Sequence, residues 1–190
     1  QRQMCIRDSY LGLELQSLAL YVLASFKRND QLSSESGLKY FVLSALSSGL
    51  LLYGCSLIYG FSGSTNFDQI SNNISEVQYG LTLGIVFILV GLAFKISAVP
   101  FHMWAPDVYQ GSPTSVTIFF AILPKIAALS VFIRFLYVPF INLIDQWQTI
   151  IIFVSIASMV FGAVAAIGQK NLKRLMLSLI HISEPTRLSA

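Results

Sequence analysis

The stretch LTLGIVFILVGLAFKISAVPFHMWAPDVYQGSPTSV, residues 81–116, decides the fold. It contains most of an apolar run from about Tyr79 to Ala105, which is far longer than a strand and lacks strict alternation. At about 1.5 Å per residue, such a run can cross a hydrocarbon layer of about 30 Å as a helix. Lys95 and Pro100 interrupt it. Because proline removes a backbone hydrogen bond and crowds the carbonyl four residues earlier, we expect this helix to be broken.

Four further apolar stretches flank this run, at about Tyr10–Phe26, Leu38–Phe61, Ser115–Val138 and Thr149–Ile167. Polar, turn-rich segments such as KRNDQLSSESGLK, FSGSTNFDQISNNISE and YQGSPT connect them. The chain is 55% hydrophobic and 11% charged, whereas a soluble domain has about 25% charged residues. Only helices satisfy every backbone group of a separate segment inside lipid. We therefore predict an all-α, polytopic transmembrane helix bundle with about five spans, the third of them broken.

The basic residues outside the apolar stretches predict the orientation. They lie in the first connection and after the fifth stretch, as Lys27, Arg28, Lys39, Lys170, Lys173 and Arg174. The second and fourth connections contain no Lys or Arg. Because basic loops stay on the inner side, segments 27–39 and 168–174 are predicted to be cytoplasmic.

Several functional classes are disfavoured by composition. The net charge of +3 is small and scattered, so no nucleic-acid partner is expected. The two cysteines, Cys5 and Cys55, indicate neither a disulfide framework nor a metal site. The sequence has no Gly-rich nucleotide loop. The lipid bilayer is the partner that the composition predicts.

The two ends of the chain differ in character from the rest. QRQMCIRDS (residues 1–9) and LSLIHISEPTRLSA (residues 177–190) resemble translated sequencing adapters, and we predict that both are non-native. The alternative is a short amphipathic arm at each end. Residues 10–176 are then the native membrane domain.

Three ionisable residues are embedded in apolar helices, namely Glu14, Lys95 and Lys125. Such a group near the bilayer centre costs about 2.5–3.5 kcal/mol on insertion scales, so it commonly faces a wet or protein-lined interior. We predict that these three residues carry the function. In the alternatives, Glu14 is interfacial and the lysines are structural.

The residues around these charges are weaker candidates. Pro100 marks the helix break, where freed backbone groups can line a polar cavity, although it could also be a harmless kink. His102 is a second-rank candidate, because a lone histidine beside a break is more often structural. Arg134 lies nearer its helix end, where its side chain can reach the headgroups.

Four segments resemble subunit N of NADH-quinone oxidoreductase, an antiporter-like membrane subunit family of bacterial respiratory complex I. They are LGLELQSLALYVL (11–23), GLKYFVLSALSSGLLLYG (37–54), FKISAVPFHMWAPDVYQGSPTSV (94–116) and AIGQKNLKRLM (166–176). The DVYQG continuation favours subunit N over related subunits of multi-subunit sodium/proton antiporters. The resemblance ends after Met176, which places the residues beyond it in doubt.

The resemblance implies a fold, a function and residue roles. It implies an inverted-repeat fold of which this chain holds helices five to nine, and a translocase that couples electron transfer from NADH to quinone with proton translocation. Glu14, Lys95 and Lys125 match the family's proton-carrying positions, while a further charged residue on helix twelve lies outside this sequence. The family places NADH, flavin, iron–sulfur clusters and quinone on other subunits, so no cofactor is expected here. The other membrane subunits are the expected partners. The alternatives are a sodium/proton antiporter subunit and a purely structural scaffold.

Overall fold

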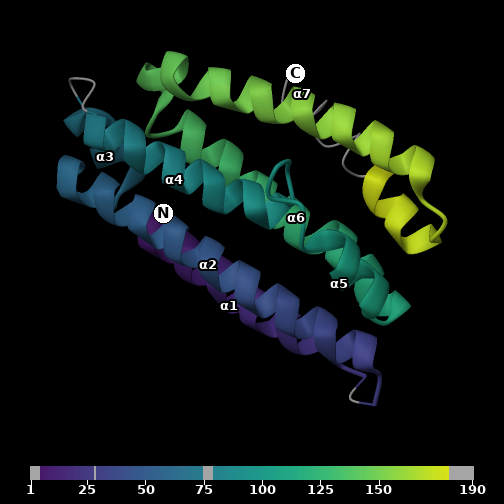
Figure 1. Cartoon of the computed structure of the whole chain (residues 1–190). Helices are drawn as coiled ribbons and strands as arrows, with labels where there is room; N and C mark the ends of the chain where they lie inside the picture. Colours follow the sequence, from purple (N-terminus) through teal and green to yellow (C-terminus); the bar gives the residue numbers. More distant parts are fainter. Residues whose placement is uncertain (1–4, 28, 75–78, 180–190) are drawn as a thin grey trace.

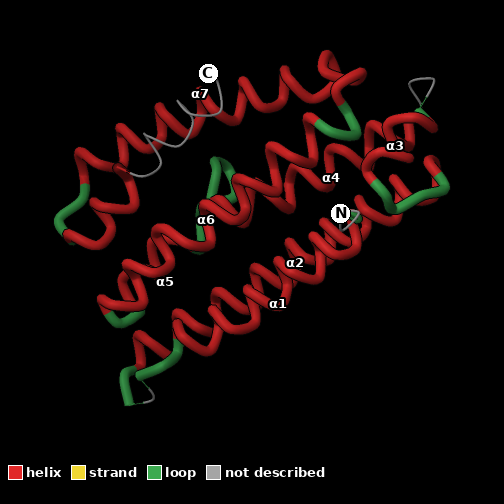
Figure 2. Tube along the Cα trace, turned by 180° about the vertical axis from the view of Figure 1, so that it is seen from behind, coloured by secondary structure: helices red, strands yellow, loops and turns green. Residues whose placement is uncertain are grey.

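The computed structural model describes residues 5–27, 29–74 and 79–179, and among these residues it contains helices and no strand. The predicted all-α bundle is therefore confirmed (Figures 1 and 2). The elements in chain order are α1 (Ile6–Ala24), α2 (Gln31–Ser62), α3 (Phe67–Asn73), α4 (Tyr79–Ile96), α5 (Ala105–Gly111), α6 (Thr114–Tyr137), the short 3₁₀ helix η1 (Ile141–Leu143) and α7 (Ile144–Gly168). A further helical segment covers residues 172–179.

Helices α1 and α2 form a long antiparallel pair that lies side by side in both views (Figures 1 and 2). Segment 27–39 was predicted to be a loop connection. This prediction is wrong from Gln31 onward, because α2 already begins there. The side chain of Asp30 accepts a hydrogen bond from the Leu32 backbone N–H at 3.1 Å and so caps the helix. The polar residues after it are thus the first turns of α2.

Glycines allow α2 and α4 to approach each other closely. A Cβ atom added to Gly54 on α2 would lie 2.8 Å from the Gly84 carbonyl oxygen on α4, and one added to Gly91 would lie 2.7 Å from the Leu51 Cβ. Small residues let backbones pack closely where lipid supplies no hydrophobic driving force between helices. This contact fixes α4, and with it Lys95, against α2.

The predicted break divides the third apolar run into α4 and α5. Helix α4 ends at Ile96, and Ser97 takes a left-handed backbone conformation with φ 58°. Two groups freed by the break find partners in other parts of the fold. The Phe94 carbonyl accepts a hydrogen bond from Trp104 Nε1 at 3.1 Å, and the Val99 N–H donates to Ser158 Oγ on α7 at 3.0 Å.

The second connection contains a short helix, α3, that we did not predict. Asn66 caps it by accepting a hydrogen bond from the Asp68 N–H at 3.1 Å. Phe67 and Ile70 are buried against the bundle. With only two apolar anchors in seven residues, the segment lacks the periodicity that identifies longer helices.

Four helical segments are long and apolar enough to cross a membrane: Gln31–Ser62, Tyr79–Ile96, Thr114–Tyr137 and Ile141–Gly168. Helix α1, the first predicted span, forms over 19 residues but carries Arg7, Asp8 and Glu14. It begins within residues 1–9, whose non-native origin stays a prediction. Residues 180–190, most of the second such segment, lie outside the described residues.

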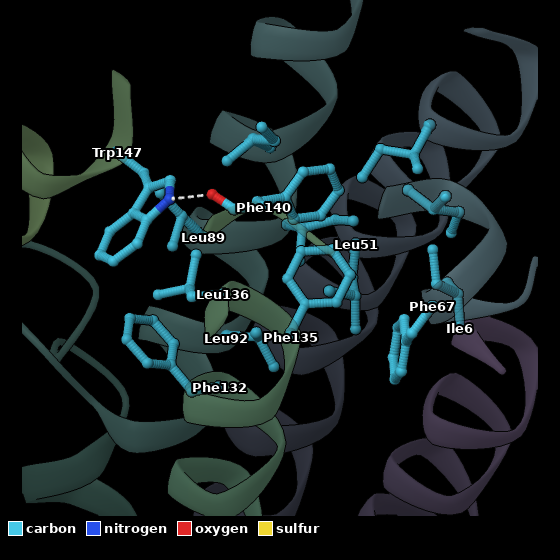
Figure 3. Packing of buried hydrophobic residues seen from close by; sticks show 14 of the residues in the cluster. Ile6, Leu51, Phe67, Leu89, Leu92, Phe132, Phe135, Leu136, Phe140 and Trp147 are labelled. Carbon is cyan, nitrogen blue, oxygen red and sulfur yellow. Dashed lines mark hydrogen bonds between the residues drawn. The ribbon is translucent and has the colours of Figure 1, made fainter. Parts of the chain in front are cut away.

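The apolar core consists of two clusters at different levels of the bundle. The first contains Leu13, Leu51 and a group of aromatic side chains in which Trp147 Nε1 donates to the Phe140 carbonyl at 3.0 Å (Figure 3). The second contains Leu20 and Tyr40. Because Leu13 and Leu20 are both on α1, about two turns separate the clusters along this helix.

Candidate functional site

A buried ion pair lies at the level between the two apolar clusters. The Lys95 ammonium on α4 is 3.2 Å from a carboxylate oxygen of Glu14 on α1. The Lys95 side chain is 7% exposed and that of Glu14 is 21% exposed. The structure thus brings together two of the three residues singled out from the sequence, which lie 81 positions apart.

Three serine hydroxyls complete the surroundings of this ammonium group. Lys95 Nζ donates to Ser17 Oγ at 2.8 Å, Ser44 Oγ at 3.1 Å and Ser48 Oγ at 3.3 Å. Ser48 in turn donates to the Glu14 carboxylate at 2.6 Å. Burying a charge is costly unless it is paired and hydrogen-bonded, and here both conditions are met.

Helical spacing places these acceptors on the correct faces. Glu14 and Ser17 are three residues apart on α1, and Ser44 and Ser48 are four residues apart on α2, so each pair lies one above the other. The close contact between α2 and α4 then brings Lys95 to both pairs. Two helices supply acceptors and the third supplies the charge.

The three serines were not predicted from the sequence. The available signal was the recurrence of small polar residues at helical spacing along α2, namely Ser33, Ser36, Ser44, Ser47 and Ser48, all of which are buried. Serines in one face of an apolar helix need acceptors or donors within the protein. Of this set, Ser44 and Ser48 contact Lys95, while the other three donate to backbone carbonyls.

The other predicted residues lie at other places. Lys125 is buried at 5% exposure on α6, a helix that packs against both α1 and α4. Arg134 is exposed on α6, and its reach toward the headgroups stays a prediction. Pro100 is exposed in the break, and the half-buried His102 ring lies 4.3 Å from the Phe161 ring on α7.

A second charged cluster lies at the end of the bundle where α5 meets the beginning of α2. Asp107 on α5 is 2.8 Å from Lys39 Nζ and 3.1 Å from Arg174 Nη2. Lys39 also pairs with Glu35, one turn earlier, at 2.8 Å. Basic residues from the first connection region and from the segment after α7 therefore meet at one end, as the alternation of spans requires.

The described residues do not offer a metal site: in 5–27, 29–74 and 79–179, no group of three or more His, Cys, Asp or Glu side chains could hold an ion. The chemistry available at the Lys95 site is proton binding and release by an amine, a carboxylate and hydroxyl groups.

Apolar helices with one broken span and a buried, hydrogen-bonded ion pair define a polytopic, all-α membrane protein. The chain belongs to the NADH:quinone oxidoreductase/Mrp antiporter, TM family, whose sequence pattern matches residues 6–179. It is a multi-pass protein of the bacterial inner membrane.

Several relatives are similar over most of this chain. NADH-quinone oxidoreductase subunit N of Pelagibacter ubique is 80% identical over 167 residues, which cover 88% of this chain and 36% of the relative. The subunit N of Rhodospirillum rubrum is 62% identical over 170 residues, covering 88% of this chain and 35% of that protein. The chain thus spans about a third of the length of these curated relatives.

Solved structures share the fold. A chain of respiratory complex I from Thermus thermophilus with bound aureothin matches with a TM-score of 0.79 and 35% identity, over 93% of this chain and 38% of that chain. A chain of the Mrp complex from Dietzia sp. DQ12-45-1b matches with a TM-score of 0.87 over 97% of this chain and 35% of that chain. At 22% identity, the latter likeness concerns the fold alone.

Proposed function

We propose that this chain is part of a membrane subunit of a proton-translocating NADH-quinone oxidoreductase, and that Glu14, Lys95 and Lys125 carry protons within it. The observation that carries this proposal is the ion pair between Lys95 and Glu14, buried among three serines. A scaffold has no need of such a group, whereas an ion route requires one.

The pair has the energetic scale that a pumping step needs. Two opposite unit charges about 4 Å apart interact by roughly 4 kcal/mol at an effective dielectric of about 20. The intact Lys95–Glu14 pair favours a protonated amine, whereas a buried amine without its counterion favours the neutral form. Separating Glu14 from Lys95 would therefore release a proton toward Lys125, which is buried on the neighbouring helix α6.

Relatives support subunit N over the sodium/proton antiporter alternative. The proteins named subunit N are 80% and 62% identical to this chain, whereas the Mrp chain is 22% identical. By this proposal, the partners are the other membrane subunits of the complex. NADH, flavin, iron–sulfur clusters and quinone then bind to other subunits, and segments 27–39 and 168–174 face the cytoplasm.

The test is a Lys95→Ala variant in the full-length subunit, assembled in its complex in inverted membrane vesicles. We expect NADH-driven proton uptake to be abolished or sharply reduced, because the amine that binds the proton is lost. Arg134→Ala is the matched control, since it removes an exposed cation from α6 and should leave proton uptake unchanged. Full pumping by Lys95→Ala would refute the proposal.

A further inference from the structure

One face of α2 connects the charged end of the bundle with the Lys95 site. Ser36, Tyr40 and Ser44 follow one another at intervals of four residues, and all three are buried. Ser36 lines a cavity of about 220 Å³ at the charged end, together with Glu35, Lys39, Asp107 and Arg174. Ser44 accepts a hydrogen bond from Lys95. At about 1.5 Å per residue, roughly 12 Å of helix separates Ser36 from Ser44.

Aromatic rings occupy the interval between this cavity and Lys95. Tyr40 stacks on Trp104 with ring centroids 4.6 Å apart and an interplanar angle of 11°. Tyr21 packs edge-on against Tyr40 at 4.9 Å. Tyr40 and Trp104 are 5% and 6% exposed, so the stack closes the interval to bulk water.

A hydroxyl pair lies at the Lys95 end of this interval. The Tyr21 hydroxyl donates to Ser44 Oγ at 2.7 Å, and the Lys95 ammonium donates to the same oxygen at 3.1 Å. An ammonium group has three donors and no acceptor, but a neutral amine has a lone pair. When Lys95 is neutral, Ser44 can therefore donate to it.

One ring of the stack, that of Trp104, belongs to the segment after the helix break. Trp104 immediately precedes α5, and Asp107 lies in its first turn. Asp107 bridges to Lys39 on α2, beside Tyr40, and to Arg174. Helix α5 lies beside the beginning of α2, so a shift of α5 would separate Trp104 from Tyr40 (Figure 1).

From this arrangement we infer that the Tyr40–Trp104 stack is the inner gate of the proton route, and that the Tyr21–Ser44 pair behind it delivers protons to Lys95. The inference rests on the proposed function and deepens it. With the gate open, a hydronium ion from the inner side gives a proton to Tyr21 and becomes water, while Tyr21 gives its own proton to Ser44 and Ser44 gives its own to neutral Lys95. Each hydroxyl gains one proton and loses one.

The test measures access to both sides of the stack in the full-length subunit, within its complex in inverted vesicles. Glu35→Cys and Ser44→Cys are made separately in a background without other cysteines. A small, membrane-impermeant methanethiosulfonate reagent is added from the inner side, and the labelling rate is measured. We expect Glu35→Cys to react much faster than Ser44→Cys, because Glu35 lines the cavity in front of the gate and is half exposed, whereas Ser44 is buried behind the gate.

Trp104→Ala should then raise the labelling rate of Ser44→Cys about tenfold. The free energy of one aromatic pair corresponds to a shift of this size in the equilibrium between the closed and the open gate. Trp104→Ala should leave the Glu35→Cys rate nearly unchanged. Trp104→Phe keeps an aromatic ring and should stay close to the parent protein, which separates loss of the gate from misfolding. Equal rates at the two cysteines with the stack intact, or no acceleration by Trp104→Ala, would overturn the gate. Labelling requires no pumping, so full pumping by Lys95→Ala would refute the proposed function and leave this result standing.

Discussion

Two charged clusters join α1, α2, α4 and α5, and their atomic distances are nearly the same although their surroundings differ. The Lys95–Glu14 distance is 3.2 Å, and the Lys39–Asp107 distance is 2.8 Å. The Lys95 side chain is 7% exposed, whereas that of Lys39 is 44% exposed. Water and salt screen the exposed cluster, and the buried pair is screened much less. Distance alone therefore says little about what a pair contributes.

The clusters also differ in the number of hydrogen-bond partners around the cation. Lys95 has three serine acceptors in addition to its carboxylate, while Lys39 is held by two carboxylates at the surface. Serines satisfy a buried ammonium group without adding charge to the apolar interior. This difference supports the proposal that the inner cluster binds and releases a proton, whereas the outer cluster links α5 to α2 and to the segment after α7.

The largest expected effect is that of Glu14→Ala. This change removes the counterion of a buried amine, which must then stay charged without it or give up its proton, and removing one partner of a buried pair costs about 3–5 kcal/mol. We expect a corresponding loss of stability in denaturant titration of the full-length subunit purified in detergent. Lys95→Met combined with Glu14→Ala should recover most of the loss, because no buried charge then remains. A single variant as stable as the parent would mean that the pair does not hold the charge.

The second expected effect is that of Asp107→Asn, and it should be smaller and sensitive to salt. This change removes the carboxylate that joins α5 to both Lys39 and Arg174. The three side chains are each more than a third exposed, so water and salt screen both bridges. We expect a reduced melting temperature at low salt that approaches the parent value near 1 M salt, where the Debye length is about 3 Å. A difference that persists in high salt would contradict screening.

The sequence predicted the spans and the embedded charges because both follow from the cost of polar groups in lipid. A run such as that around Lys95 is readable because length, hydropathy and an ionisable residue occur in the same segment. Helix ends were less predictable. The Asp30 cap extends α2 into a segment that looked like a loop, and α3 is too short to have a clear period.

The partners of Lys95 could not be read from the sequence, because they depend on how helices pack. No motif or short-range spacing in the sequence links Ser17 to Ser44, or either serine to Lys95. Their meeting follows from the close approach of α2 and α4, where the Gly84 carbonyl oxygen leaves no room for a Cβ at Gly54 and the Leu51 side chain leaves none at Gly91. The proton-carrying roles of Glu14, Lys95 and Lys125 stay predictions.

The smallest expected effect is that of Glu35→Gln. This variant tests whether the contribution of a salt bridge to stability depends on its distance or on which elements it joins. Glu35 lies 2.8 Å from Lys39 Nζ, the same distance as Asp107. It belongs to α2 itself, four residues before Lys39, so its bridge joins two points that the helix backbone already joins. Exposed pairs of this spacing contribute little to stability. We expect the melting temperature of Glu35→Gln to equal that of the parent at both low and high salt, under the conditions in which Asp107→Asn is measured. If the two variants lowered it equally, the value of Asp107 would come from its charge near Lys39 and not from linking α5 to α2.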